Sequence, residues 1–235
     1  MALCLVACVP EGPPTGRDTP KTSKPAGSAR RTIHAAKPDP LLTAPFKDDF
    51  ERTDLGEEWR QLSGAWRIRN GRLCAKNAKN RGVWLRRRLP TNARIEFDAQ
   101  SESSDGDIKA EVWGDGHSGA TKVSYTDATS YLTIFGGWKN QRHVLARIDE
   151  HGKDRQAVEV KPASDDPRER RVEPGQVYRF KIERTEGKTI TWWVDDVLMH
   201  ELVDPNPLTG EGHDHFGFND WAVPVCYDNV EVTPL

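Results

Sequence analysis

The sequence predicts an all-β fold: a two-sheet antiparallel jelly-roll sandwich of about a dozen strands, preceded by a disordered N-terminal linker. The first observation is compositional, since eight Trp, 19 Gly and 16 Pro beside only two Met are typical of short strands joined by turns. The second is that short segments from Phe46 onward alternate apolar and polar residues, and none keeps a helical period for long. The third is the absence of an internal repeat, which argues against a propeller or solenoid.

The strands are predicted in order along the chain. The segment 65–75 reads as a hairpin that turns at Asn70-Gly71, because Asn-Gly between two alternating runs is the strongest short hairpin signal. A second hairpin over 189–202 is expected to turn at Asp195-Asp196. The other strands are predicted over 93–99, 107–114, 131–138, 143–148, 156–160, 177–184, 215–219 and 226–232.

Residues 1–8 are apolar and end in Leu5-Val6-Ala7-Cys8, which matches the bacterial lipobox and predicts lipidation of Cys8. The apolar stretch is shorter than a secretory signal and has no basic region, so we expect the true start codon to lie upstream. An ordinary short apolar N-terminus is the alternative interpretation. The lipobox would make the protein a lipid-anchored component of the bacterial cell envelope, in the periplasm or on the outer surface.

Residues 9–45 hold eight of the 16 prolines and almost no large apolar side chains. This composition predicts a disordered linker, because it cannot bury enough surface to fold. The linker carries a formal charge of +3 and the rest of the chain −5. A basic spacer would hold the folded domain, predicted over 46–235, away from an anionic membrane, which the chain would contact only through the lipid anchor.

Three further observations bear on the environment, the partners and the chemistry. Cys74 and Cys226 remain in the folded part, where they form either one disulfide, as an envelope protein allows, or two buried free thiols. The net charge of −2 gives no electrostatic reason to expect nucleic acid as a partner. Nucleotide-binding loops, paired CxxC motifs and a Gly-x-Ser-x-Gly elbow are absent from the sequence.

Three segments resemble concanavalin A-like (LamG-type) jelly-roll domains. They are FKDDFERTDLGEEWRQLSGAWRIRNGRLCA (46–75), TWWVDDVLMHEL (191–202) and HFGFNDWAVPVCYDNVEV (215–232). The resemblance implies that the last strand pairs near the first. Members of this group include sugar-binding modules, glycoside hydrolases, keto-sugar-processing domains of the DUF1080 type and lipoproteins, so the function has to be argued from the site. The resemblance also implies a structural Ca²⁺ near the termini, with Asp48, Asp49 and Asp228 as candidate ligands.

The segment IEFDAQSE (95–102) offers catalytic candidates. Glycosidases of the laminarinase type, which it resembles, carry a nucleophilic Glu and an acidic Glu on one strand. Glu96 and Asp98 fit the first part of that motif, but Glu102 comes one or two residues late and Gln100 cannot donate the proton. A solvent-facing strand accounts for the same residues.

A carbohydrate-binding face is predicted from exposed tryptophans at Gly-rich strand ends, where loops gather and a sugar ring can stack on an indole. The hydroxyl groups of the sugar would need polar partners nearby. The predicted ligand-binding residues are Trp113, Asp115, His117, Trp138, Asn140, Arg142, His213, Asn219 and Trp221. Trp66 and one of Trp192 and Trp193 are assigned to the core.

Two other segments carry side chains that can bind metal ions. His213 and His215 would share a strand face, but no third ligand is evident, so a polar surface is the preferred interpretation. Asp105, Asp107 and Asp115 lie in acid-rich turns that could bind Ca²⁺, although Asp and Gly also make ordinary turns. No other cofactor is expected.

The sequence therefore favours a lipid-anchored, non-catalytic carbohydrate-binding domain, with a carbohydrate or cell-surface glycan as partner. A glycoside hydrolase or keto-sugar-processing enzyme on the same fold is the first alternative, since whether the chain is an enzyme is left open. A structural envelope protein with buried tryptophans is the second. Two facing carboxylates in a cleft would favour the enzyme, and tryptophan faces over an acid-poor groove would favour binding.

Overall fold

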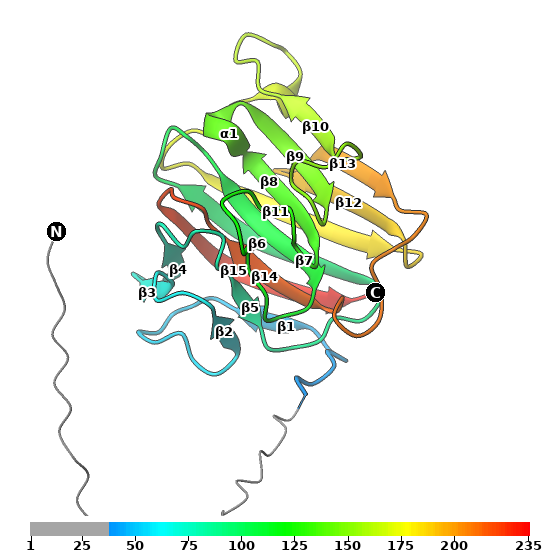
Figure 1. Cartoon of the computed structure of the whole chain (residues 1–235). Coiled ribbons are helices and arrows are strands. Elements are labelled where there is room, and N and C mark those ends of the chain that lie inside the picture. The colour runs from blue at the N-terminus through cyan, green and yellow to red at the C-terminus, as the bar shows by residue number, and fades with distance from the viewer. Residues whose placement is uncertain (1–37) are drawn as a thin grey trace, which may run out of the picture. The chain divides into compact units, whose positions relative to one another are not determined.

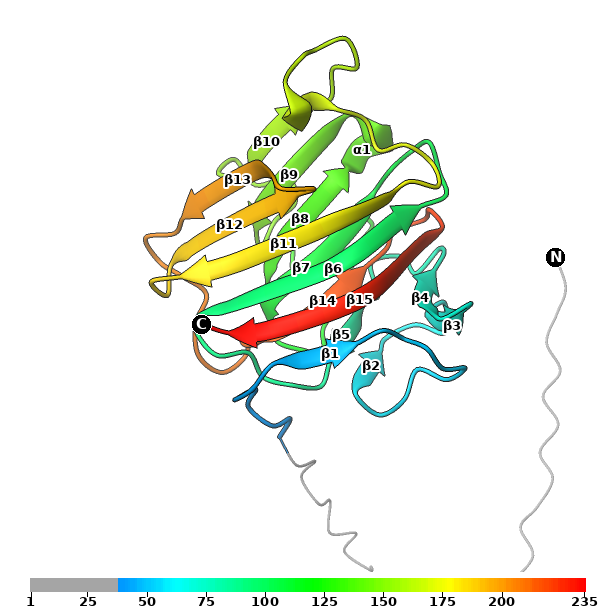
Figure 2. The same cartoon turned by 180° about the vertical axis from the view of Figure 1, so that it is seen from behind.

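A computed structural model of the protein describes residues 38–235, and these form two antiparallel β-sheets packed face to face (Figures 1 and 2). The predicted all-β sandwich is thereby confirmed. In spatial order, sheet 1 contains β13 (Val197–Val203), β12 (Thr189–Val194), β11 (Val177–Thr185), β6 (Ala93–Ser101), β15 (Val225–Pro234), β4 (Arg72–Ala75) and β3 (Arg67–Arg69), and β1 (Phe46–Asp48) also pairs with β15. Sheet 2 contains β10 (Gln156–Glu159), β9 (Arg142–Arg147), β8 (Tyr131–Gly136), β7 (Ile108–Gly114), β14 (His215–Asn219), β5 (Val83–Leu85) and β2 (Trp59–Gln61). The short helices α1 (Gly137–Asn140) and η1 (Pro167–Glu169) lie in connections.

The ends of the domain meet as expected, because β1 pairs with β15 in a register that sets Phe46 opposite Val232. Both predicted hairpins are present. β3 and β4 are joined at Asn70-Gly71, and β12 and β13 at Asp195-Asp196, with positive φ at all four residues. Two-residue turns of this kind match the right-handed twist of the strands they join.

The core lies between the sheets and is built around aromatic rings. The Phe97 ring from β6 stacks on Phe180 of β11 with ring centroids 4.8 Å apart, and it meets Phe218 of β14 edge-on at 5.0 Å. Phe218 stacks in turn on Tyr227 of β15 at 3.9 Å. These contacts join both sheets through alternate residues of four strands, which is the burial that the alternating pattern predicts. Trp66 and Trp192 are buried in the core, and Trp193 is half-buried.

The folded unit begins at Pro38, eight residues before the predicted boundary, so the linker prediction is wrong for residues 38–45. Leu42 is buried, and its N–H donates to the Arg88 carbonyl at 2.8 Å. Asp39 forms ion pairs with Arg60 at 2.9 Å and with Arg86 at 3.4 Å. These contacts offset the conformational entropy that residues 38–45 lose when they become ordered. Composition alone places this proline-containing segment in the linker. The predicted lipidation site Cys8 and the rest of the predicted linker lie outside the described residues.

Cys74 of β4 and Cys226 of β15 are directly opposite in register and form a disulfide with an S–S distance of 2.08 Å. The bond joins two positions that are 152 residues apart in sequence. In residues 38–235, every helix is too short or too polar to cross a membrane.

Candidate functional site

The outer face of sheet 2 carries the candidate site. Ile108, Ala110 and Val112 of β7 face the core between the sheets, so the alternation of the strand turns Lys109 and Glu111 toward the outside. These charged residues are nevertheless buried, because loop 115–130 folds over the outer face and packs Tyr125 and neighbouring residues against it. A cavity remains where this cover ends.

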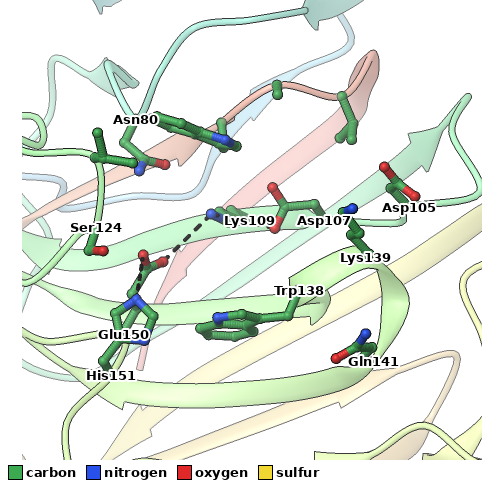
Figure 3. Close-up of a pocket in the computed structure, with 14 residues that line it drawn as sticks. Asn80, Asp105, Asp107, Lys109, Ser124, Trp138, Lys139, Gln141, Glu150 and His151 are labelled. Atoms are coloured by element: carbon green, nitrogen blue, oxygen red, sulfur yellow. Dashed lines mark ion pairs between the residues drawn. The ribbon is translucent and has the colours of Figure 1, made fainter.

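The cavity, called the Lys109 cavity below, has a volume of about 600 Å³, within the range of small-molecule sites. Six connections meet around it: loop 76–81, the turn at 102–107, loop 121–125, the turn at 137–141 before β9, the turn at 148–151 after β9, and loop 220–223. Figure 3 shows the residues that line it, which are Asn80, Asp105, Asp107, Lys109, Val123, Ser124, Trp138, Lys139, Gln141, Glu150, His151, Trp221, Ala222 and Val223.

An ion cluster forms part of the cavity wall. The Lys109 Nζ lies 3.4 Å from Asp107 Oδ1 and 3.6 Å from Glu150 Oε2, and all three residues are buried (Figure 3). Burial raises the pKa of Asp107, although Lys109 counteracts it. Burial by itself would lower the pKa of Lys109, but the adjacent carboxylates outweigh it and the pKa is raised. The cavity therefore presents one firmly protonated ammonium group between two acids.

Glu111 and Asp220 are two further buried carboxyl groups in this part of the fold. Glu111 is fully buried and accepts hydrogen bonds from Tyr125, Ser130 and Asn219, yet burial raises its pKa to about 7. Asp220, next to the cavity residue Trp221, accepts from the Ala78 N–H at 2.8 Å, and burial raises its pKa to about 6. Together with the ion cluster, these residues make four buried carboxyl groups and one buried cation, Lys109. Hydrogen-bond acceptors therefore outnumber donors among them.

Trp138 reaches the cavity from a strained turn. Trp138, Lys139 and Asn140 have φ values of 52°, 59° and 61°, a left-handed conformation that non-glycine residues rarely adopt in succession. The Asn140 side chain holds this turn, since its amide donates to the Ser104 and Val172 carbonyls and its oxygen accepts from the Val172 N–H. Strain of this kind persists only where surrounding contacts enforce it, and it is typical of functional sites.

The two indoles at the cavity are associated with cations outside the ion cluster. The Arg142 and Arg155 guanidinium groups lie 5.6 and 5.2 Å from the Trp138 ring centroid. The Lys79 ammonium lies 4.4 Å from the Trp221 ring centroid. Such contacts restrict the orientation of each indole before any ligand binds. Both rings are only partly buried, so part of their apolar surface remains available.

The structure gathers only some of the predicted ligand-binding residues. Trp138 and Trp221 line the cavity, and Arg142 contacts it through the Trp138 ring. Trp113 does not line it, because its indole is fully buried and donates to the Pro90 carbonyl at 3.3 Å. Its position beside Gly114 marks a strand end, but the indole packs into the core between the two sheets.

The remaining predicted residues have structural partners. Asn140 and Asn219 are buried, the first in the α1 turn and the second against Glu111. Asp115 accepts from the backbone of His117 and Ser118 and so shapes the start of the covering loop, while the His117 side chain is exposed. His213 is hydrogen-bonded through Nδ1 to the Thr129 carbonyl at 2.7 Å.

Glu96 and Asp98 lie on the outer face of sheet 1, away from the Lys109 cavity. Both pair with Arg179 of the neighbouring strand, at 3.7 and 3.3 Å, and Asp98 also accepts from Asn229. Glu102 accepts a hydrogen bond from Gln100 instead of facing the other two acids. A cross-strand charge ladder therefore accounts for these residues.

The candidate metal ligands are engaged in other contacts. Asp48 accepts from both terminal nitrogens of Arg52 and from the Trp59 indole, and Asp49 accepts from the Glu51 N–H. Asp228 accepts from the Asn229 N–H. His215 lies between Asp214 and Asp39, at 2.7 and 3.4 Å. Within residues 38–235 no group of three or more His, Cys, Asp or Glu side chains has a metal-binding arrangement.

Asn80, Lys109 and Glu150 are cavity residues that the sequence analysis missed. Asp105 and Asp107, which the sequence places in acid-rich turns as candidate Ca²⁺ ligands, both line the cavity. A signal for Lys109 was present in the sequence, because Lys109 and Glu111 alternate with apolar residues over 108–112. That pattern was indistinguishable from a solvent-facing strand until the covering loop was placed.

No protein-family model and no curated protein sequence matches the chain. Solved structures of similar fold are numerous, with 388 matching chains, so the fold alone does not select a function. One is the Emp47p carbohydrate recognition domain, with a TM-score of 0.57, 11% identity, and coverage of 83% of this chain and 96% of that one. Others are a native glycosidic hydrolase (TM-score 0.56, 10% identity, 83% and 98% coverage) and alginate lyase Aly36B (0.54, 10%, 82% and 97%). At these identities the likeness shows a shared sandwich fold.

Proposed function

We propose that the chain is a carbohydrate-binding member of the concanavalin A-like jelly rolls and that the Lys109 cavity holds the sugar. The observation that carries this proposal is the joint presence of two indoles, Trp138 and Trp221, and a polar wall in one cavity. A sugar ring has an apolar C–H face and a rim of hydroxyl groups, so it needs an aromatic surface and fixed polar partners together. The carbohydrate-associated neighbours of similar fold are consistent with this proposal.

The test is a glycan array followed by calorimetric titration of the Trp138→Ala and Trp221→Ala variants. Each variant should bind at least about tenfold more weakly, equivalent to ~1.4 kcal/mol, with little change in melting temperature, because both indoles are partly exposed. Trp113→Ala is the matched control. It should lose roughly 3–5 kcal/mol of stability, because its indole is fully buried, and the protein that remains folded should bind normally. Unchanged affinity in both cavity variants would refute the assignment of the site.

A second function, glycoside hydrolysis, is favoured by the two carboxyl groups beside Lys109. Since Asp107 and Glu150 both contact one nitrogen, their nearest oxygens are at most about 7 Å apart, a range that includes both retaining and inverting geometries. The raised pKa of Asp107 would suit a proton donor. Binding remains the first proposal, because the Lys109 ammonium lies against both acids and competes with a substrate for them.

Hydrolysis is tested with the glycans that the array identifies, by measuring release of reducing ends. Asp107→Asn and Glu150→Gln should each abolish release while the glycan is still bound. If the wild-type protein binds the glycan but releases no reducing ends, hydrolysis is refuted and the binding function stands.

We also propose that the domain is presented from a bacterial membrane through lipidated Cys8 and residues 9–37. This proposal rests on Leu5-Val6-Ala7-Cys8 and on the proline-rich composition that follows.

A further inference from the structure

The ion cluster in the wall of the Lys109 cavity is looser than a set of hydrogen bonds. Lys109 Nζ lies 3.4 Å from Asp107 Oδ1 and 3.6 Å from Glu150 Oε2. A charge-assisted hydrogen bond spans about 2.7–2.9 Å, so both contacts are too long to be one. Two contacts also use at most two of the three N–H groups of an ammonium. The cluster therefore retains hydrogen-bonding capacity that its own members do not use.

Lys109 and Glu150 are held in place by contacts outside the cluster. The Lys109 N–H donates to the Tyr227 hydroxyl at 3.2 Å, and that hydroxyl donates to the Lys109 carbonyl at 2.9 Å. Glu150 Oε1 accepts from the Tyr125 N–H at 2.9 Å, so the other carboxylate oxygen, Oε2, is the one that faces Lys109. The charges are thus positioned before any ligand binds, which lowers the entropic cost of binding.

All three charged side chains can be reached from the cavity. The exposed fractions of the side chains are 7% for Lys109, 12% for Asp107 and 9% for Glu150. All three line the cavity, and Figure 3 shows them grouped in its wall. A volume of about 600 Å³ accommodates a sugar ring. A ring that fills the cavity therefore contacts the cluster as well as the indoles.

The cluster selects a ligand group that both accepts and donates hydrogen bonds. A hydroxyl oxygen about 2.8 Å from Lys109 Nζ and from one carboxylate oxygen accepts from the ammonium and donates to the carboxylate. It thereby bridges a contact that is too long for a direct hydrogen bond. Carboxylate and sulfate groups only accept, and they would also meet the negative charges of Asp107 and Glu150. A ligand ammonium only donates, so it cannot accept from Lys109.

Two such bridges can form at once, because both contacts of the cluster share one nitrogen. Hydroxyl groups on neighbouring carbons of a sugar ring lie side by side and can approach a single ammonium together. We propose that Lys109, Asp107 and Glu150 determine the specificity of the cavity and bind two free hydroxyl groups on neighbouring ring carbons of a neutral hexopyranose. One hydroxyl bridges Lys109 to Asp107, and the other bridges Lys109 to Glu150. This inference rests on the proposed function, which it deepens by naming the class of sugar.

The first test uses the wild-type protein and does not depend on the folding of a variant. Affinities are measured by calorimetric titration for the methyl pyranosides of glucose, mannose and galactose, and for derivatives that lack one hydroxyl group, at position 2, 3, 4 or 6. For a parent sugar that binds, two derivatives should bind at least about tenfold more weakly, the strength expected of a hydrogen bond to a charged group. The two missing hydroxyl groups should be those of neighbouring ring carbons.

Variants then assign these hydroxyl groups to the cluster. Lys109→Met removes the ammonium, and it should bind the parent sugar and the two derivatives about equally weakly. Glu150→Gln keeps an oxygen for the Tyr125 N–H. It should reduce the loss at one of the two positions only, since Lys109 and Asp107 still bind the other hydroxyl. Lys181→Met is the matched control, because Lys181 is also a strand lysine but does not line the cavity, and it should leave every affinity unchanged.

Any other pattern of losses in the wild-type protein would overturn the proposal and leave the proposed function standing. The same holds if none of the three parent sugars binds although other glycans bind on an array. An unchanged pattern of losses in Lys109→Met or in Glu150→Gln would also overturn it. If Lys109→Met does not fold, the wild-type series and Glu150→Gln decide. If the wild-type protein bound no carbohydrate on an array, the proposed function would fail and this inference would fail with it.

Discussion

Glu111 illustrates at the level of one residue how the covering loop changes the chemistry of sheet 2. On an open sheet its carboxyl group would titrate in water, but here Tyr125 and Ser130 donate to one oxygen and Asn219 donates to the other. These hydrogen bonds favour the ionised form, and burial outweighs them, so the pKa rises from 4.5 to about 7. The ionised Glu111 carboxylate therefore destabilises the folded state above neutral pH.

The pH dependence of stability follows from this shift. A carboxyl group whose pKa is higher in the folded than in the unfolded chain binds its proton more tightly when folded. Its contribution is therefore complete below pH 4.5 and is lost as the pH rises toward about 7. The wild-type protein should therefore have a lower free energy of unfolding at pH 8 than at pH 5. We expect Glu111→Gln to reduce this difference by up to about 3 kcal/mol, measured by urea unfolding at the two pH values.

The glutamine can also satisfy an atom that is unpaired in the wild-type protein. Asn219 Oδ1 has no partner within residues 38–235, and it could accept from the new amide after rotation of the Asn219 side chain. The control is Glu211→Gln, since Glu211 is exposed. Equal pH dependence in the two variants would show that the Glu111 pKa is not raised.

At the level of elements, the cavity depends on the close approach of two turns. The turn at 102–107 meets the end of β8, where the Asp107 N–H donates to the Gly136 carbonyl at 2.9 Å. A side chain at Gly106 would place its Cβ only 2.6 Å from that carbonyl oxygen, so only glycine fits there. This contact links Asp107 of the ion cluster to the turn that carries Trp138.

Gly106→Ala is therefore expected to disturb both stability and binding. Gly71→Ala is the matched control: both glycines have φ of 68°, but the Cβ at residue 71 would meet the flexible Glu51 side chain, and residue 71 does not line the cavity. Each variant should lose about 1–2 kcal/mol from the left-handed backbone, with a larger loss at Gly106. Thermal melts and glycan titration should show weakened binding for Gly106→Ala alone.

At the level of the whole molecule, the first residues of the folded unit close one end of sheet 2. Asp39 pairs with Arg60 of β2 and approaches His215 of β14, and Leu42 is buried. Burial of one leucine contributes roughly 1.5–3 kcal/mol, so this segment adds measurably to stability although it contains no strand of its own.

The fragment 46–235 should accordingly be less stable than the fragment 38–235 by about 2–4 kcal/mol. Chemical denaturation of the two fragments measures the difference. Leu42→Ala in the longer fragment should reproduce most of it. Identical midpoints for the two fragments would show that residues 38–45 do not contribute to folding.

The anchoring proposal makes a separate prediction for the full chain in a bacterial host. Cys8→Ala should move the protein from the membrane fraction to the soluble fraction, because the thiol that accepts the lipid is gone. Cys4→Ala should have no such effect, since Cys4 is not preceded by a lipobox. Membrane association that survives Cys8→Ala would contradict lipidation at this position.

The sequence by itself determined the sandwich, because the strand period of two and the turn residues are local properties of the chain. Asn70-Gly71 and Asp195-Asp196 needed no tertiary information to be identified as turns. The same local reasoning identified Trp138 and Trp221 beside glycine and polar neighbours, and it identified Trp113 on the same grounds although that side chain is buried.

Only the tertiary structure decided which of these residues share a site. Trp113 packs into the core between the sheets, whereas Trp138 lies on the outer side of sheet 2 beside the covering loop. Lys109 differs from Lys181, on the outer face of sheet 1, because loop 115–130 covers Lys109 and its neighbours. The cavity joins residues as distant in sequence as Asn80 and Trp221. Burial and the pKa of Glu111 both follow from segments that are far apart along the chain, and such segments leave no local pattern.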